Sequence, residues 1–165
     1  MPDSFPKFLV LYVLIFVLCG SGCVKSEHVS EGLVTLTSWD QTVLDAKKLN
    51  RPIVLLVEQR NCGFCQALKK NLIKPLANDS HFGSKAIYVS MMTDYDEPTL
   101  EKDGRQISGF DYSMQLDAST TPTVLFFNSE GEELQKRVVG YLETDEYIAT
   151  MKSRIERSAA AVTGP

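Results

Sequence analysis

Two cysteines three positions apart directly follow an apolar segment near the middle of the chain. The segment Pro52–Val57 has the length and β-branched content of a strand that is buried on both faces. After Cys62 and Cys65, apolar residues recur at helical spacing up to Pro75: Ala67, Leu68, Leu72 and Ile73. The sequence therefore predicts a strand, a tight turn and a helix in immediate succession, with Cys62 at or near the N-terminus of the helix.

The rest of the chain divides into short helical and strand-like segments. A capping box at Ser38 starts a predicted helix over 39–49. The other predicted elements are a strand at 86–91, a hairpin tip at 102–105, a short helix at 111–116, a strand at 123–127, its hairpin partner at 134–139 and a helix at 144–157. This order predicts an α/β fold with a central mixed β-sheet flanked by helices on both faces.

The cysteine pair has the spacing of a redox-active dithiol. A thiolate attacks a disulfide, whereas free cysteine, with a pKa of about 8.5, is mostly protonated at neutral pH. A helix N-terminus stabilises the anion through its unpaired N–H groups, which makes Cys62 the expected nucleophile and Cys65 the resolving thiol. We expect Gly63 to permit the turn and the approach of a partner chain, and Phe64 to form an apolar lip.

Three other interpretations of the pair stay open at this point. A zinc site needs about four ligands, and His28 and His81 lack zinc-finger spacing to the pair. A purely structural disulfide would constrain the unfolded chain little, because it closes a very short loop. Buried inert thiols fit poorly with the turn residues Asn61 and Gly63. No metal ion is therefore predicted at the pair.

The N-terminus has the pattern of an export signal. Lys7 precedes an apolar run from Phe8 to Leu18, and small residues then lead to Cys23. This run is shorter than the roughly 20 residues that span a bilayer, so we expect a secretory leader over 1–22. The small residues directly before Cys23 resemble the bacterial lipoprotein signal, which implies a lipid on Cys23; ordinary cleavage and an uncleaved anchor are the alternatives. We expect a tether over 23–36, a folded domain over 37–158 and a flexible tail over 159–165.

The charge distribution argues against nucleic acid as a partner. The formal net charge is −4, and acids and bases are interspersed without a basic stripe. The segment Thr93–Phe110 is rich in acids but lacks the spacing and central glycine of a calcium loop. We interpret it as a solvated surface insert rather than a cation site.

Two motifs together resemble the thioredoxin superfamily. Cys-Gly-Phe-Cys opens a helix with Pro75 ten residues beyond Cys65, and Thr120-Thr121-Pro122-Thr123 precedes a strand about 57 residues later. The resemblance covers about residues 36 to 157. Within the superfamily, three segments are similar to periplasmic thioredoxin-like proteins of the sulfur-oxidation type: Glu58–Cys65, the insert through Gly109-Phe110, and Gly140-Tyr141.

The resemblance implies roles for residues outside the cysteine pair. Pro122 would follow Thr121 through a cis peptide bond and lie against the pair, and Thr121 would offer backbone groups to an extended partner segment. Thioredoxin has a buried aspartate six residues before its first cysteine, where this chain has Leu56. Glu58 is the nearest upstream acid, and we expect it to accept and return the proton of the resolving thiol, unless it is only a solvated acid at a strand end.

The predicted function is that of an extracytoplasmic thiol:disulfide oxidoreductase in the cell envelope. It would reduce disulfides of other proteins, receive electrons from a membrane thiol–disulfide donor and act as a monomer, with no cofactor beyond its own two thiols. A disulfide oxidase, an isomerase and a non-catalytic adaptor that uses the same scaffold are the alternatives. Asn61 replaces the tryptophan that precedes the first cysteine in thioredoxin, so thioredoxin's own partners are not implied.

Overall fold

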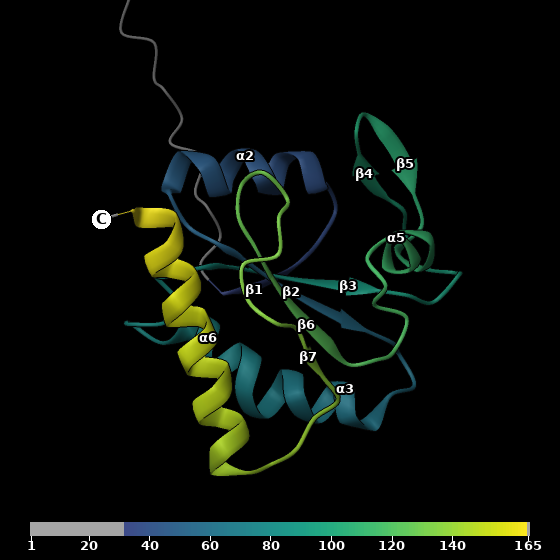
Figure 1. The fold of residues 1–165 in the computed structure, drawn as a ribbon. Helices are drawn as coiled ribbons and strands as arrows, with labels where there is room; N and C mark the ends of the chain where they lie inside the picture. The colour runs from purple at the N-terminus through teal and green to yellow at the C-terminus, as the bar shows by residue number, and fades with distance from the viewer. Residues whose placement is uncertain (1–31, 165) are drawn as a thin grey trace, which may run out of the picture.

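The structure is a computed structural model that describes residues 32–164. A central sheet is enclosed between helices on its two faces (Figure 1). The strands are β1 (Leu33–Thr35), β2 (Ile53–Glu58), β3 (Ile87–Met92), β4 (Leu100–Lys102), β5 (Arg105–Ile107), β6 (Thr123–Phe127) and β7 (Val138–Val139). The helices are α2 (Trp39–Leu49), α3 (Gly63–Leu68), η1 (Lys69–Ile73), α4 (Lys74–Asn78), α5 (Gly109–Gln115) and α6 (Asp145–Thr163).

The main sheet is mixed, as the sequence predicts. Its strand order is β1-β3-β2-β6-β7, and the strands β4 and β5 form a separate hairpin. β1, β3 and β2 run parallel, whereas β6 pairs antiparallel with β2 and β7 pairs antiparallel with β6. The hairpin tip predicted at 102–105 and the helices and strands predicted on either side of the cysteine pair are confirmed.

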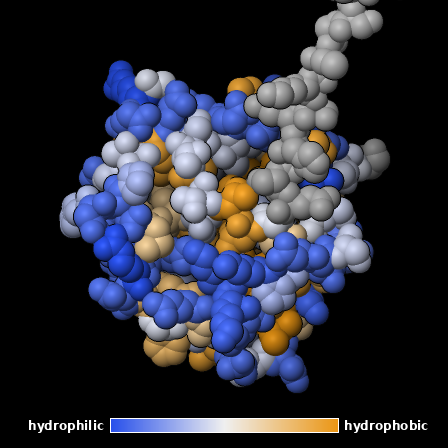
Figure 2. All heavy atoms as spheres, turned by 180° about the vertical axis from the view of Figure 1, so that it is seen from behind, coloured by the Kyte–Doolittle hydropathy of each residue, from blue (hydrophilic) through white to orange (hydrophobic). Residues whose placement is uncertain are grey.

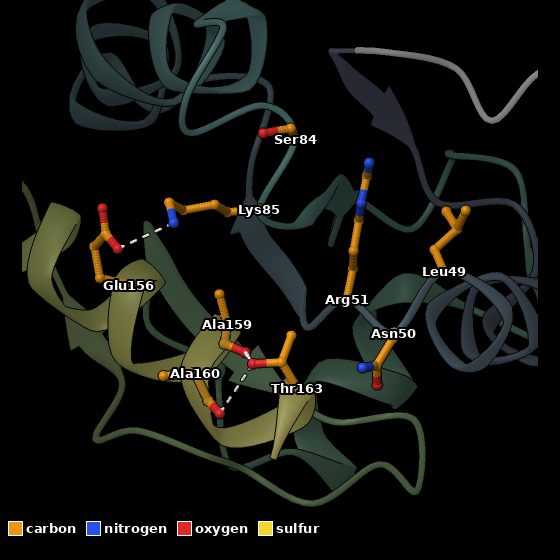
Figure 3. A pocket seen from close by; sticks show the side chains of 9 residues that line it. All are labelled: Leu49, Asn50, Arg51, Ser84, Lys85, Glu156, Ala159, Ala160 and Thr163. Atoms are coloured by element: carbon orange, nitrogen blue, oxygen red, sulfur yellow. Dashed lines mark hydrogen bonds and ion pairs between the residues drawn. The ribbon is translucent and has the colours of Figure 1, made fainter. Parts of the chain in front are cut away.

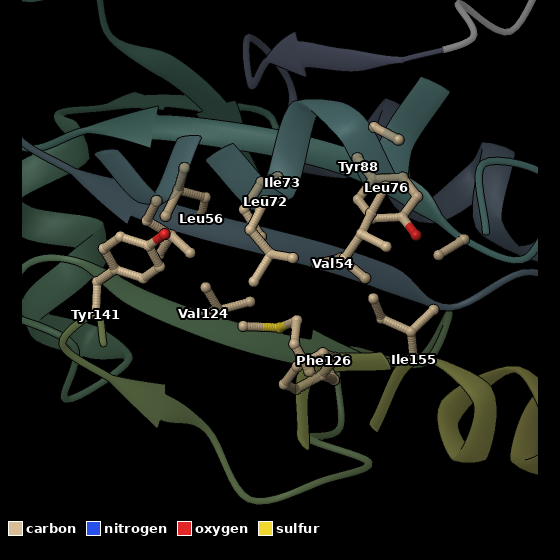
Figure 4. Close-up of a cluster of buried hydrophobic side chains, with 14 residues drawn as sticks. Val54, Leu56, Leu72, Ile73, Leu76, Tyr88, Val124, Phe126, Tyr141 and Ile155 are labelled. Atoms are coloured by element: carbon tan, nitrogen blue, oxygen red, sulfur yellow. The ribbon is translucent and has the colours of Figure 1, made fainter. Parts of the chain in front are cut away.

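The two faces of β2 belong to two different hydrophobic clusters. Side chains alternate across a strand, so Val54 and Leu56 face one cluster, while the residues between them face the other. The first cluster includes residues of α3, η1, α4 and α6 (Figure 4). The second includes Trp39 of α2 and Tyr112 of α5, whose rings pack edge to face at 5.6 Å. The predicted helical cover on both faces is therefore confirmed.

Three boundaries differ from the sequence-based prediction. β1 lies inside the segment predicted as a tether, where it pairs with β3 from Leu33 to Thr35. At the other end, α6 continues through Ala159 to Thr163, into the predicted flexible tail. Alanine has the highest helix propensity of all residues, which accounts for the extension. The predicted hairpin strand at 134–139 is shorter, because only Val138 and Val139 form the ladder with β6.

The helix after the cysteines does not end at Pro75. It continues through η1, which has π-helical geometry, into α4, where Pro75 occupies the first turn. Proline lacks an N–H group and is tolerated in the first turn of a helix, and the wider turn before it leaves room for the ring. Leu72, Ile73 and Leu76 all stay buried against the sheet as a result.

A carboxylate of α2 binds the tip of the β4–β5 hairpin. Asp40 accepts hydrogen bonds from the backbone N–H groups of Asp103 and Gly104, each at 2.9 Å. These two bonds, Gly104 first, hold the pKa of Asp40 below its ordinary value of 3.8. A group whose pKa is depressed on folding stabilises the fold above its unfolded pKa, and the contribution is lost as the pH falls through the folded value.

We therefore expect the bonds between the hairpin tip and Asp40 to hold at neutral pH and to weaken in acid, while Leu100 of β4 stays buried in the same cluster as Trp39 of α2. The amide proton signals of Asp103 and Gly104 should shift as the pH is lowered from 6 to 2 in an NMR titration. In the Asp40→Asn variant, which has no carboxylate at this position, the pH dependence of the Gly104 signal should be much smaller. Unchanged signals in the unmodified protein over the whole range would mean that Asp40 does not hold the hairpin.

One buried hydroxyl in α6 is left without a partner. Ser158 is fully buried, and its Oγ makes no hydrogen bond with any group in residues 32–164. Removing an unsatisfied buried polar group is favourable, so Ser158→Ala should raise the free energy of unfolding by about 1 kcal/mol in urea titrations. Ser153→Ala, at an exposed position of the same helix, measures the gain from helix propensity alone. Equal gains in the two variants would contradict the expectation.

Seen from behind, the surface is largely hydrophilic, and hydrophobic residues gather only in limited patches (Figure 2). Within residues 32–164, no helix combines the length and the apolar character needed to cross a membrane.

Candidate functional site

The cysteine pair forms a disulfide at the start of α3. Cys62 is the N-cap residue, with extended backbone angles, and its sulfur accepts a hydrogen bond from the backbone N–H of Cys65 at 3.1 Å. The two sulfurs are bonded at 2.00 Å. Cys62 is partly exposed, whereas Cys65 is fully buried. This asymmetry makes Cys62 the sulfur that another molecule can reach, and leaves Cys65 to react only with Cys62.

The register of the sheet brings the second sequence motif to the same place. Val57 of β2 lies opposite Thr123 of β6, so the segment that leads from β2 to Cys62 runs beside Thr121 and Pro122. The Thr121–Pro122 peptide bond is cis, as the resemblance implies, and Pro122 is buried. The Thr121 hydroxyl donates a hydrogen bond to Gln59 at 3.0 Å. Thr121 and Pro122, which are far from Cys62 in the sequence, therefore lie beside the segment that leads into Cys62.

Glu58 is buried and paired with a cation. Its side chain is only 5% exposed, and its carboxylate accepts a hydrogen bond from Lys69 Nζ at 2.5 Å. The simpler interpretation of Glu58 as a solvated acid is therefore wrong. Lys69 lies four residues after Cys65 and so projects from the same face of the helical segment. Glu58 follows Leu56 by two residues on β2 and faces the same side of the sheet, toward that helix.

The two residues between the cysteines are both exposed. The side chain of Phe64 is 67% exposed, which fits the predicted apolar lip. Gly63 does not have a positive φ, and an added Cβ there would meet no atom of the described chain within 4 Å. The turn itself thus does not require glycine, contrary to the expectation that Gly63 permits the turn. The open space around it remains available to a partner chain.

A group of charges that the sequence analysis missed ties the acidic insert to the cysteine loop. The Arg60 backbone N–H donates to Asp94 at 2.9 Å, and the Arg60 guanidinium donates to Asp96 at 2.8 Å and also to Glu97. We call these four residues the Arg60 clasp. The hydrogen bonds to Asp96 and Glu97 raise the pKa of Arg60, and Arg60 lowers the pKa of Asp96. The insert is therefore partly ion-paired, rather than solely a solvated surface as predicted.

No sequence signal for the clasp was available, because its partners are 34 to 37 positions apart. The parallel register explains why they meet. Glu58 lies opposite Met92 at the ends of β2 and β3, so the two following loops leave the sheet at the same edge. The carboxyl edge of parallel strands is where sites usually form in open α/β sheets.

A separate hollow of about 450 Å³ lies away from the cysteines. Arg51 and Lys85, which precede β2 and β3, line it together with residues of α6 (Figure 3). It is thus at the opposite end of these strands from Cys62. Within residues 32–164, no three His, Cys, Asp or Glu side chains are grouped so as to hold a metal ion. Cys23, the predicted lipidation site, lies outside the described residues.

The mixed sheet, the capped cysteine pair and the neighbouring cis-proline define a protein with the thioredoxin fold. The model of the thioredoxin-like domain family matches residues 39–155, which is most of the chain. The chain belongs to this family. No curated protein is significantly similar to it in sequence.

Solved structures share the fold at low sequence identity. Thioredoxin f from spinach chloroplast has a TM-score of 0.57 and 16% identity, over 81% of this chain and 99% of its own. A poplar thioredoxin h has a TM-score of 0.54 and 20% identity, over 74% and 96%. The DsbH oxidoreductase has a TM-score of 0.53 and 16% identity, over 83% and 94%. A thioredoxin-like fold with the Cys62–Cys65 pair supports a thiol–disulfide oxidoreductase.

Proposed function

We propose that this protein is an extracytoplasmic thiol:disulfide oxidoreductase that reduces disulfides of cell-envelope proteins. One observation carries the proposal: a partly exposed Cys62 caps a helix and is bonded to a fully buried Cys65. A dithiol of this geometry exposes one sulfur for attack and keeps the other for resolution. The neighbouring cis Thr121–Pro122 bond supports the same function, because Thr121 would offer its backbone groups to an extended partner segment.

The proposed reaction has two exchange steps. In the reduced protein, the Cys62 thiolate attacks one sulfur of a partner disulfide, so the partner S–S bond breaks and a mixed disulfide forms. The released partner thiolate takes up a proton. Cys65 then loses its proton and attacks the Cys62 sulfur, which releases the second partner thiolate. The partner gains two electrons and two protons, and the protein ends in the disulfide form that the structure contains.

We assign the proton of Cys65 to Glu58 in the second step. The carboxylate is buried on the sheet face that packs against the cysteine helix, and Lys69 holds it in place. A positioned carboxylate in such a site is suited to accept a proton and to return it. Glu58 would thus replace the aspartate that thioredoxin has at the position of Leu56.

The proposed location of the protein in the cell envelope is based on the first 25 residues of the sequence. The apolar run before Cys23 supports export, and lipidation of Cys23 would anchor the domain at a membrane. The resemblance to periplasmic thioredoxin-like proteins of the sulfur-oxidation type supports the same compartment. Regeneration of the dithiol there would need a membrane thiol–disulfide donor, because the disulfide form accepts two electrons in each cycle.

The equilibrium reduction potential of the Cys62–Cys65 disulfide tests the direction of the reaction. The purified protein is equilibrated with mixtures of reduced and oxidised dithiothreitol or glutathione, and its thiols are counted after alkylation. A potential near that of thioredoxin, about −270 mV, supports a reductant. A potential near −120 mV would instead identify a disulfide oxidase.

The same alkylation experiment separates an enzyme from an adaptor. The Cys62 thiol of a redox protein reacts quickly with an alkylating agent once the disulfide is reduced, and Cys65 reacts slowly because it is buried. If both thiols were inert, a non-catalytic adaptor would be the better description. An isomerase would accelerate the refolding of a protein whose disulfides have been scrambled. A monomeric reductant should raise this refolding rate no more than its free thiol alone does.

A further inference from the structure

Tyr95 is an exposed aromatic residue next to the predicted site. Its side chain is 75% exposed, the largest value among the exposed large hydrophobic residues of the described chain. It is followed in exposure by Phe64, between the two cysteines, at 67%. Tyrosine is enriched among the residues that contribute most to the binding energy of protein–protein interfaces.

The Arg60 clasp fixes the backbone of Tyr95 at this place. Its neighbours Asp94, Asp96 and Glu97 all bind Arg60, which is two residues before Cys62. The loop that carries Arg60 is held from its other side as well, because Gln66 of α3 donates to the Arg60 carbonyl at 3.0 Å. Tyr95 is therefore kept beside the segment that leads into Cys62, while Phe64 follows Cys62.

The ring of Tyr95 is also supported from beneath. It packs on Phe110 of α5, with the ring centroids 4.5 Å apart. The start of α5 is close to the end of β3, since an added Cβ at Gly109 would lie 1.9 Å from the carbonyl oxygen of Met92. An aromatic side chain that is anchored in this way loses little conformational entropy when a partner covers it.

The clasp also has an excess of negative charge. Two carboxylates, those of Asp96 and Glu97, bind the Arg60 guanidinium, and a third, that of Asp94, binds the Arg60 backbone N–H, so three negative charges accompany one positive charge. The Asp96 side chain is 69% exposed. Complementary charge steers association and disfavours partners of the same sign. A partner segment that reaches Cys62 past Tyr95 would therefore be favoured if it carried a basic residue.

We infer that Tyr95 is a specificity-determining residue that contacts the partner polypeptide, and that the preferred partner has an apolar and a basic residue beside its disulfide. This inference depends on the proposed function and names its class of substrate. Phe64 and Tyr95 would cover the partner chain on the two sides of Cys62. Neither residue takes part in the exchange of electrons, so their effect is on binding.

Reduction kinetics of two synthetic peptides test the inference, with dithiothreitol returning the protein to its dithiol form and the direct reaction of dithiothreitol with each peptide subtracted. Each contains one intramolecular disulfide, flanked by leucine and lysine in one peptide and by serine and glutamate in the other. The neutral bis(2-hydroxyethyl) disulfide serves as a small substrate that has neither a basic nor an apolar flanking residue. The enzyme is the full protein, and its variants are Tyr95→Ser, Tyr95→Phe and, as the matched control, Leu44→Ser on α2, where Leu44 is 59% exposed.

We expect Tyr95→Ser to raise KM for the leucine–lysine peptide about tenfold, with kcat nearly unchanged, because a ground-state contact is lost. Tyr95→Phe should retain the low KM, Leu44→Ser should have no effect, and all proteins should reduce the small disulfide equally. Added salt should raise KM for this peptide. An unchanged KM in Tyr95→Ser, or no preference between the peptides, would overturn the inference. If the unmodified protein reduced no disulfide at all, the proposed function would be what fails.

Discussion

Replacing Cys62 by serine should reduce the rate of disulfide exchange by at least about a thousandfold, as expected when a nucleophile is removed. Cys65 cannot take its place, because its side chain is fully buried behind Cys62. The fold should survive, since Cys62 is a partly exposed N-cap and serine is itself a favourable N-cap residue. The measurement is the rate of reduction of bis(2-hydroxyethyl) disulfide, with thermal unfolding followed by circular dichroism.

Cys65→Ser is the matched control, and we expect it to block the second step of the exchange rather than the first. The first step still occurs, but the mixed disulfide between Cys62 and the partner is no longer resolved. It should accumulate and appear as an increase in mass in electrospray spectra of the unreduced protein. If Cys62→Ser kept full activity, or if Cys65→Ser formed no adduct, the assignment of attacking and resolving sulfur would be wrong.

The cysteine pair and the cis-proline could be predicted because short motifs encode them. Cys62 and Cys65 lie three residues apart at a strand-to-helix turn, and Thr121-Pro122 stands directly before a strand, so local patterns contain both. What sequence reasoning missed is mainly non-local. The Arg60 clasp joins two loops that meet only because β2 and β3 are parallel neighbours, and no pattern within either loop indicates the other.

The missed secondary structure has the same explanation. β1 has only three residues, and its pairing with β3 stabilises it rather than any strong propensity of its own. A proline inside a helical pattern usually ends or kinks the helix, yet the packing of Leu72 and Leu76 on the sheet favours continuation past Pro75 through a π-helical turn. Lys69 lies within the helix that the sequence predicts after Cys62, but its pairing with Glu58 depends on how that helix packs against the sheet, which no local pattern indicates.

The pairing of Lys69 with Glu58 leads to the second large expected effect. In Lys69→Met the carboxylate of Glu58 would remain in a site where its side chain is 5% exposed, without the cation that now lies 2.5 Å away. Removing one partner of a buried ion pair typically costs 3–5 kcal/mol, and because Lys69 is itself 30% exposed we expect about 3 kcal/mol, at the lower end. The free energy of unfolding from urea titrations measures this loss.

The double variant Glu58→Leu with Lys69→Met isolates the cause. It removes both charges and leaves apolar groups against the neighbouring cluster, so most of the lost stability should return. If Lys69→Met alone cost less than about 1 kcal/mol, water would have to reach the carboxylate, as at an exposed ion pair. Glu58 would then lack the enclosed environment that its proposed role as proton acceptor for Cys65 requires. The Glu58 carboxylate therefore affects both the stability of the fold and the step in which Cys65 resolves the mixed disulfide. In the double variant the free energy of unfolding should recover, whereas the resolving step should stay slow.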